Sequence, residues 1–295
     1  SALLGAAAWA APALLHCRAS SFSVGERSWL ASCFSATAPS IASPARAEVP
    51  WTALDGERLA LATASHAGTD RHVAVVRDIL HSAGLGEDDL GCPPSWPTDT
   101  ATRDEMVREL GRPERVRMNC SGKHATMLLA CVANGWDTAT YLDPNHPLQL
   151  HIREVVERLT GAKVAATAVD GCGAPVHAMS LTALARAAHR IGTASERSPF
   201  ALHRLAGTLV RAVRENPWAI DGPGRPDTIA IERLGVFAKG GAEGVIVMAT
   251  RDGHALALAF PASPVVRAVV VHVPMHGEAV LPEHLDPVHA DVVAG

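Results

Sequence analysis

The chain has 295 residues, of which 48% are hydrophobic and 19% charged, and a formal net charge of −4. This balance is typical of a globular protein that can bury a sizeable core, and it excludes an intrinsically disordered chain. The slight negative charge gives no basic field, so we expect neither nucleic acid nor an anionic membrane surface as a partner.

Six cysteines occur without the spacing of a disulfide framework and without a Cys-x-x-Cys pair. In a chain of this length the pattern indicates reduced thiols and a cytoplasmic protein. The apolar run over residues 2–15 is too short to cross a bilayer, and no basic segment of a signal peptide precedes it. The three lysines, Lys123, Lys163 and Lys239, are candidate functional residues because lysine, unlike arginine, can lose its proton.

The composition changes near residue 46. Residues 1–45 are rich in alanine and serine, contain no lysine and show weak periodicity, whereas the remainder has the patterns of an ordinary protein of helices and strands. We therefore expect an atypical segment over residues 1–45, either misread or disordered, followed by one domain over residues 46–295.

Five helices are predicted from apolar residues three or four positions apart, between a polar or proline start and a glycine or proline stop. Asp70 is a candidate cap for the first of them. The predicted helices cover residues 70–84, 121–134, 147–161, 180–192 and 200–214.

Strands are predicted near the C-terminal end. Residues 245–250 and 254–260 flank Arg251-Asp252-Gly253, which is a hairpin signal, and residues 265–272 form a third β-branched run. Helices followed by a hairpin sheet favour an α+β fold over a doubly wound parallel sheet.

Four glycine-containing segments could carry chemistry, at residues 64–68, 119–124, 170–175 and 239–244. Cys120 and Lys123 are three residues apart at a predicted helix start, so both side chains can turn to the same side. With Cys172 they would supply three of the four positions of a tetrahedral zinc. The alternatives stay open: His124 competes with Lys123 as a ligand, and Cys172 can be an ordinary buried cysteine.

Ser65 is a candidate nucleophile. The side chain of the adjacent His66 diverges from it, so a lysine with a lowered pKa is the better base, and Lys239 in its glycine-rich turn is the best candidate by elimination. The plainer interpretations are a polar turn serine, a surface lysine and, for Asp170 and Glu243, solvated turn acids.

Taken together, the four segments, in this order and spacing, resemble the L-asparaginase II family, as do residues 141–147 and 222–228. The resemblance implies a serine β-lactamase-like fold, with an antiparallel sheet flanked by helices, in a homodimer that hydrolyses L-asparagine to L-aspartate and ammonia. It also implies roles for individual residues: Zn²⁺ bound by Cys120, Lys123 and Cys172; a Ser65–Lys239 pair at the reaction centre; and His124 and Asp170 in the substrate pocket, with Asp170 facing the α-amino group.

The sequence departs from the family at one point that matters for catalysis. The family carries a further Ser-x-x-Lys pair about thirty residues before the Ser65 position, whereas here no lysine precedes Lys123. Either residues 1–45 are not the native sequence or the chain is a catalytically altered relative. We expect zinc binding with impaired asparagine hydrolysis, because loss of a nucleophile and its base costs several orders of magnitude in rate. The alternative function is a zinc-bound amino-acid-binding or scaffold protein without turnover.

Overall fold

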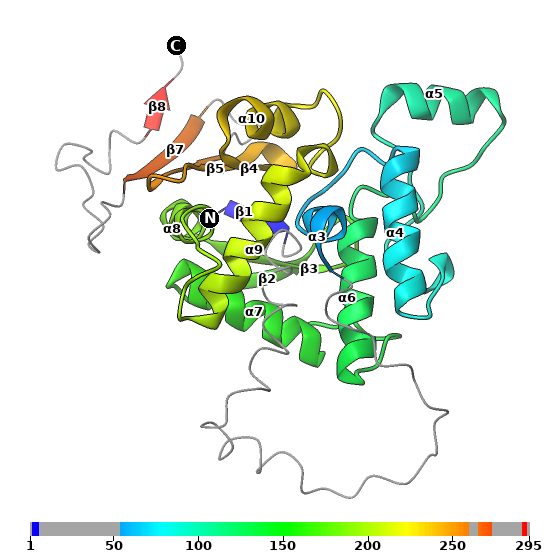
Figure 1. Cartoon of the computed structure of the whole chain (residues 1–295), viewed down its shortest axis with the longest axis horizontal. Helices are drawn as coiled ribbons and strands as arrows, with labels where there is room; N and C mark the ends of the chain where they lie inside the picture. Colours follow the sequence, from blue (N-terminus) through cyan, green and yellow to red (C-terminus); the bar gives the residue numbers. More distant parts are fainter. Residues whose placement is uncertain (1, 6–53, 260–264, 273–290, 294–295) are drawn as a thin grey trace, which may run out of the picture.

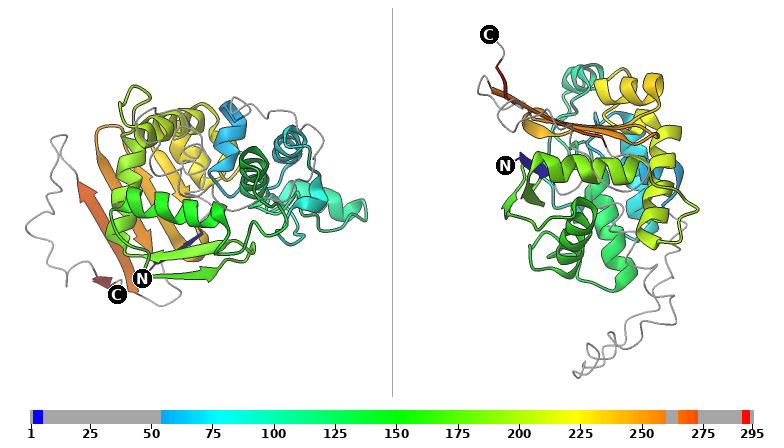
Figure 2. Two further views of the ribbon diagram at one scale, coloured as in Figure 1. Left: turned by 90° about the horizontal axis from the view of Figure 1, so that it is seen from below. Right: turned by 90° about the vertical axis from the view of Figure 1, so that its left-hand side faces the viewer.

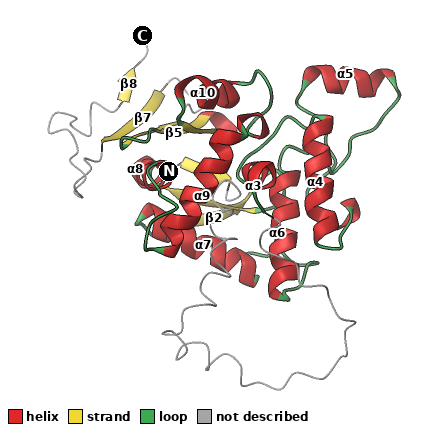
Figure 3. Cartoon of the chain, viewed as in Figure 1, coloured by secondary structure: helices red, strands yellow, loops and turns green. Residues whose placement is uncertain are grey.

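The computed structural model describes residues 2–5, 54–259, 265–272 and 291–293. The expected boundary at residues 45 and 46 lies outside the described residues. Helices and strands are both present, and the strands pair antiparallel in two sheets, so the α+β class is confirmed. Figure 3 shows the strands gathered toward one side of the molecule and the helices α4, α5 and α6 at the other.

The helices follow the periodicity of the sequence. They are α3 (Gly56–Ala62), α4 (Asp70–Ser82), α5 (Thr100–Arg108), α6 (Ser121–Asn134), α7 (Pro147–Thr160), α8 (Leu181–Gly192), α9 (Ala201–Glu215) and α10 (Pro226–Leu234), with short 3₁₀ turns at Glu87–Asp89, Pro217–Ala219 and Ala242–Gly244. All five predicted helices are among them (Figure 1). The helices α3, α5 and α10 had not been predicted.

Helix caps explain most of the boundaries. Gly135 and Gly161 adopt left-handed conformations, with φ of 69° and 65°, at the ends of α6 and α7. Ser180 caps α8 by accepting a hydrogen bond from the backbone N–H of Ala183. The expectation for Asp70 was wrong: Thr69 is the N-cap of α4, because its N–H bonds to Nδ1 of His72, and Asp70 is the first helical residue.

The larger sheet has five antiparallel strands in chain order: β4 (Phe237–Gly240), β5 (Val245–Ala249), β6 (His254–Ala259), β7 (Val265–His272) and β8 (Asp291–Val293). The predicted hairpin is β5–β6, closed by a hydrogen bond from the N–H of Thr250 to the carbonyl of His254. Alternate residues of β5 are buried because α8 packs against this sheet. A Cβ on Gly192 would lie 2.5 Å from Cβ of Ala249, so glycine lets the end of α8 approach the sheet closely.

The smaller sheet has three antiparallel strands in the order β1 (Ala2–Gly5), β3 (Pro175–Met179) and β2 (Ala166–Val169). Figure 2 shows that α8 lies close to the five-stranded sheet and that the three-stranded sheet is separate from it. The helix α6 contacts α3, α4 and α7 and is buried on all sides from Ser121 to Cys131. No helix in the described part of the chain is long and apolar enough to cross a membrane.

Candidate active site

The loop after α3 presents Ser65, a half-buried residue, between two other segments. The carbonyl of Ser65 accepts a 3.0 Å hydrogen bond from the N–H of Asp221, and the N–H of His66 donates to the carbonyl of Asn119 at 2.9 Å. These two bonds fix the serine between the start of α6 and the loop before α10.

His66 adds a side-chain contact between this loop and α6, and its ring bonds to Ser121 and not to the Ser65 hydroxyl. Its Nδ1 accepts from the N–H of Gly68 at 3.1 Å, and its Nε2 lies 3.0 Å from the hydroxyl of Ser121 and 3.4 Å from the backbone nitrogen of Gly122. Burial of the ring, with the nearby His72 and Lys123, holds the pKa of His66 well below its usual value. His66 is therefore a neutral structural residue, as the divergence of adjacent side chains predicts.

The first turn of α6 carries Lys123 directly to the serine. The Lys123 side chain is buried, and its Nζ donates to Oγ of Ser65 at 3.0 Å. A Cβ on Gly122 would lie 2.7 Å from Cγ of Leu61, so glycine permits the close contact of α3 with α6 that this hydrogen bond requires.

The turn between β2 and β3 places Asp170 and Cys172 in the same cavity as Cys120 and Lys123. Gly173 has a φ of 89°, and its N–H closes the turn on the carbonyl of Asp170 at 2.8 Å. The sulfur atoms of Cys120 and Cys172 and a carboxylate oxygen of Asp170 all lie within 4.8 Å of one another, and Sγ of Cys172 is 3.4 Å from Oδ2 of Asp170.

The two sulfurs are close enough that the ionisation of one changes the pKa of the other. The S–H of Cys172 stabilises a thiolate on Cys120, which together with the charge of Lys123 outweighs burial and lowers the pKa of Cys120 to about 5. The pKa of Cys172 is raised for the reciprocal reason, because loss of its proton would place two thiolates in contact. Two buried sulfurs, a carboxylate and an adjacent amine form a donor set that fits a thiophilic divalent cation such as Zn²⁺.

Lys239 enters from β4 and is paired with Asp227 of α10. Its Nζ donates to Oδ2 of Asp227 at 3.3 Å and also to the carbonyl of Gly240. The same carboxylate accepts the N–H of Gly240 at 2.7 Å, and both side chains of the ion pair are about one tenth exposed. Burial lowers the pKa of Lys239, and Asp227 opposes that shift.

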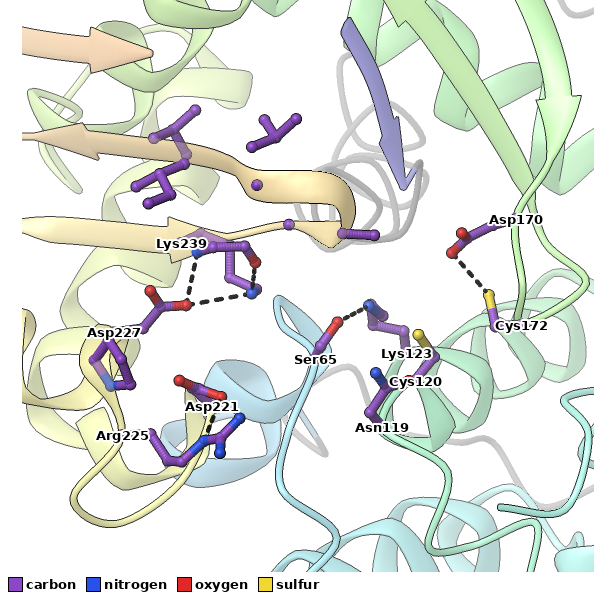
Figure 4. Close-up of a pocket in the computed structure, with 18 of the residues that line it drawn as sticks. Ser65, Asn119, Cys120, Lys123, Asp170, Cys172, Asp221, Arg225, Asp227 and Lys239 are labelled. Atoms are coloured by element: carbon purple, nitrogen blue, oxygen red, sulfur yellow. Dashed lines mark hydrogen bonds and ion pairs between the residues drawn. The ribbon is translucent and has the colours of Figure 1, made fainter. Parts of the chain in front are cut away.

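These groups line one cavity of about 570 Å³ (Figure 4). Its polar lining includes three cations and three carboxylates around the serine. The side chains that carry this chemistry are Ser65, Asn119, Cys120, Lys123, Asp170, Cys172, Asp221, Arg225, Asp227 and Lys239.

Six of the seven site residues expected from the sequence therefore share one cavity: Ser65, Cys120, Lys123, Asp170, Cys172 and Lys239. The contacts between them differ from the expectation in one respect. The lysine that donates to Ser65 is Lys123, whereas Lys239 contacts Asp227, and no hydrogen bond joins Ser65 and Lys239 within the described residues.

His124 is the expected site residue that does not line the cavity. Its ring is buried, and Nδ1 lies 2.5 Å from the hydroxyl of Tyr141, which also accepts the N–H of Gly91. Nε2 is buried without a hydrogen-bond partner in the described part of the structure. Burial and the charge of Lys123 lower the pKa of His124 to about 3, so the ring is neutral.

Sequence reasoning assigned no role to Asp221, Arg225 and Asp227. The segment 222–228 stood out in the sequence, but only the fold shows that it lines the same cavity as Ser65. Pro226 is the first residue of α10, a position that suits proline, but this backbone preference carries no information about which side chains the preceding turn presents.

Comparison with known families supports the resemblance seen in the sequence. A family model described as L-asparaginase II matches residues 17–273, which is most of the chain. The match includes part of the segment whose composition is atypical. A search of curated proteins gave no match.

Proposed function

The chain belongs to the L-asparaginase II family, and from that premise we propose that it hydrolyses the side-chain amide of L-asparagine to L-aspartate and ammonia. The observation that supports this proposal is the convergence of a serine, two buried lysines and a pair of thiols on one cavity. The proposal includes a serine β-lactamase-like fold, a cytoplasmic homodimer and a native domain over residues 46–295.

In this proposal Ser65 is the nucleophile. Its Oγ attacks the amide carbon and passes its proton to a lysine amine, while backbone N–H groups stabilise the oxyanion. The proton then leaves with the amide nitrogen as ammonia, and water hydrolyses the acyl-serine ester to release aspartate. Asp170, on the cavity wall, faces the substrate ammonium group. His124 is buried beside Tyr141 and does not line the cavity, so its role would be to hold the residues that line the substrate pocket in place.

Two lysines are candidates for the proton transfer. We propose Lys239 as the general base or its electrostatic partner, because burial lowers its pKa toward the range in which an amine can accept a proton. Lys123 is the amine in direct contact, 3.0 Å from the hydroxyl, and it can accept the proton only while no metal occupies its lone pair. Replacing each lysine separately, with the zinc content of each variant measured, distinguishes them.

We propose Zn²⁺ as the bound metal, held by Cys120, Lys123 and Cys172 with Asp170 adjacent. A neutral amine has one lone pair and two N–H bonds, so Lys123 can bind a metal and still donate to Ser65. When bound, the ion fixes the two thiolates and so shapes the adjacent pocket. Elemental analysis of wild type and Cys120→Ser should give about one zinc and none, respectively, per chain if this ligand set is right.

A second function, asparagine binding without turnover, is favoured by the absence of any lysine before Lys123. Calorimetry with L-asparagine, run beside an ammonia-release assay, separates the two functions. Heat with ammonia supports the hydrolase, heat without ammonia supports the binding protein, and no heat with no ammonia contradicts both.

The assay has a matched control. Ser65→Ala and Lys239→Met should abolish ammonia release, whereas Lys163→Met should not, because Lys163 is exposed and paired with Glu157 outside the cavity. Ammonia release that survives Ser65→Ala would refute the role of Ser65. From the missing Ser-x-x-Lys pair we expect wild-type turnover several orders of magnitude below that of an intact family member.

A further inference from the structure

Arg225 is the one guanidinium that lines the cavity within the described part of the chain. The other two cations of the cavity already have partners. Lys123 donates to Ser65 and interacts with Cys120, and Lys239 donates to Asp227 and to the carbonyl of Gly240.

Arg225 uses only one of its donors. Its Nε donates to Oδ1 of Asp221 at 3.1 Å, and within the described residues Nη1 and Nη2 have no hydrogen-bond partner. Hydrogen bonds from Thr102 are the main cause that lowers the pKa of Asp99, and the charge of Arg225 adds to that shift. The side chain is 44% exposed, so the Nη edge is accessible to a ligand. A guanidinium edge with two parallel N–H bonds matches a carboxylate in a bidentate geometry.

Asp221 fixes this guanidinium relative to the serine. The N–H of Asp221 donates to the carbonyl of Ser65, and Asp221 forms a parallel bridge with His66, so its backbone is attached to the serine loop. Asp221 has a φ of 71°, in the left-handed region that a few residue types such as aspartate tolerate. Arg225 is held in turn by its own N–H, which donates to the carbonyl of Gly222 at 3.1 Å.

Figure 4 shows Asp221 and Arg225 side by side, joined by their hydrogen bond, near the loop that carries Ser65. Asp221 is held in a left-handed backbone conformation and is bonded both to the serine backbone and to Arg225. A simple surface ion pair would need neither constraint. The arrangement sets a fixed separation between the serine and a carboxylate-binding edge.

We propose that Arg225 is a specificity-determining residue that binds the α-carboxylate of the amino-acid substrate through Nη1 and Nη2, and that Asp221 is the positioning residue that holds it. This inference rests on the proposed function and deepens it, because it explains how the cavity would select a free α-amino acid. An amide whose α-carboxylate is neutralised lacks the group that Arg225 binds.

The test uses the full-length protein and calorimetry with two ligands, L-asparagine and L-asparaginamide, in which a neutral amide replaces the α-carboxylate. Wild type should bind L-asparagine at least about 30-fold more tightly than L-asparaginamide, as expected for charge-assisted hydrogen bonds in a bidentate pair. Arg225→Met should lose that preference through weaker binding of L-asparagine, with the affinity for L-asparaginamide unchanged. Arg225→Lys, which keeps the charge and can keep the ion pair with Asp221, should retain part of the preference.

Arg233→Met is the matched control, because Arg233 is exposed on α10, the helix whose N-cap is Arg225, and does not line the cavity. It should keep the wild-type preference. If wild type prefers L-asparagine and Arg225→Met and Arg225→Lys keep the full preference, the role of Arg225 is overturned while the proposed function stands. If wild type binds neither ligand, the proposed function is wrong and this inference fails with it.

Discussion

His72 gives the protein a sensitivity to acid that can be calculated. The side chain is fully buried; its Nδ1 accepts from the N–H of Thr69 and its Nε2 donates to the carbonyl of Trp218. The first bond requires an unprotonated Nδ1, since a second proton there would face the Thr69 N–H, whereas the Nε2–H donor is present in both the neutral and the charged ring. Desolvation is the main cause that lowers the pKa of His72 to about 4, against an ordinary value of 6.5.

The direction of the effect follows from proton binding. Between pH 6.5 and pH 4 the unfolded chain binds a proton at this position and the folded chain does not, so the free energy of unfolding falls as the pH falls. The contribution is present above pH 6.5 and is lost progressively down to pH 4. With these two pKa values, lowering the pH from 7.5 to 5.0 should remove about 2 kcal/mol of stability through His72 alone.

The perturbation that isolates this contribution is His72→Gln, because a glutamine amide can accept from one N–H and donate to one carbonyl without titrating. Urea unfolding at pH 7.5 and pH 5.0 gives the change in free energy for each protein. The loss on acidification should be about 2 kcal/mol smaller in His72→Gln than in wild type, whatever the absolute stability of the variant. His81→Gln, on the exposed side of the same helix, leaves His72 intact and should keep that part of the loss. Equal losses in wild type and His72→Gln would refute the reasoning.

Three further predictions concern packing and charge. Gly192→Ala should destabilise the protein by about 1–3 kcal/mol in urea unfolding despite the better helix propensity of alanine, because the new Cβ would lie 2.5 Å from Cβ of Ala249. Adding Ala249→Gly should restore most of the lost stability. A Gly192→Ala protein as stable as wild type would contradict this close contact. Asp227→Asn should lower the free energy of unfolding by about 3 kcal/mol at neutral pH, since it leaves the nearly buried Lys239 without its counter-charge. The pKa of Lys239 should also fall further, which would be measured as labelling of its amine at lower pH. Met127→Ala, at a fully buried position of α6, should cost about 2–5 kcal/mol in the same unfolding assay, and a loss below 1 kcal/mol, well under that range, would show that the helix is less enclosed than the structure indicates.

The sequence by itself determined the local structure and the family. The start of α7 at Pro147 and its end at Gly161, and the turn of the β5–β6 hairpin at Gly253, depend on backbone preferences of single residues and their neighbours. The helices α3, α5 and α10 are 7, 9 and 9 residues long, which is too short for a helical period to be recognised in the sequence. Family membership was also readable, because four short segments in order are more specific than any one of them.

Only the tertiary structure decided which side chains meet. Ser65 and Lys123 are 58 positions apart, and their 3.0 Å contact depends on how closely α3 packs against α6 at Gly122. The pairing of Lys239 with Asp227 depends in the same way on the packing of β4 beside α10. Sequence patterns report the period and the ends of an element, which are local properties, whereas the partner of a long, flexible lysine is set by distances across the folded core.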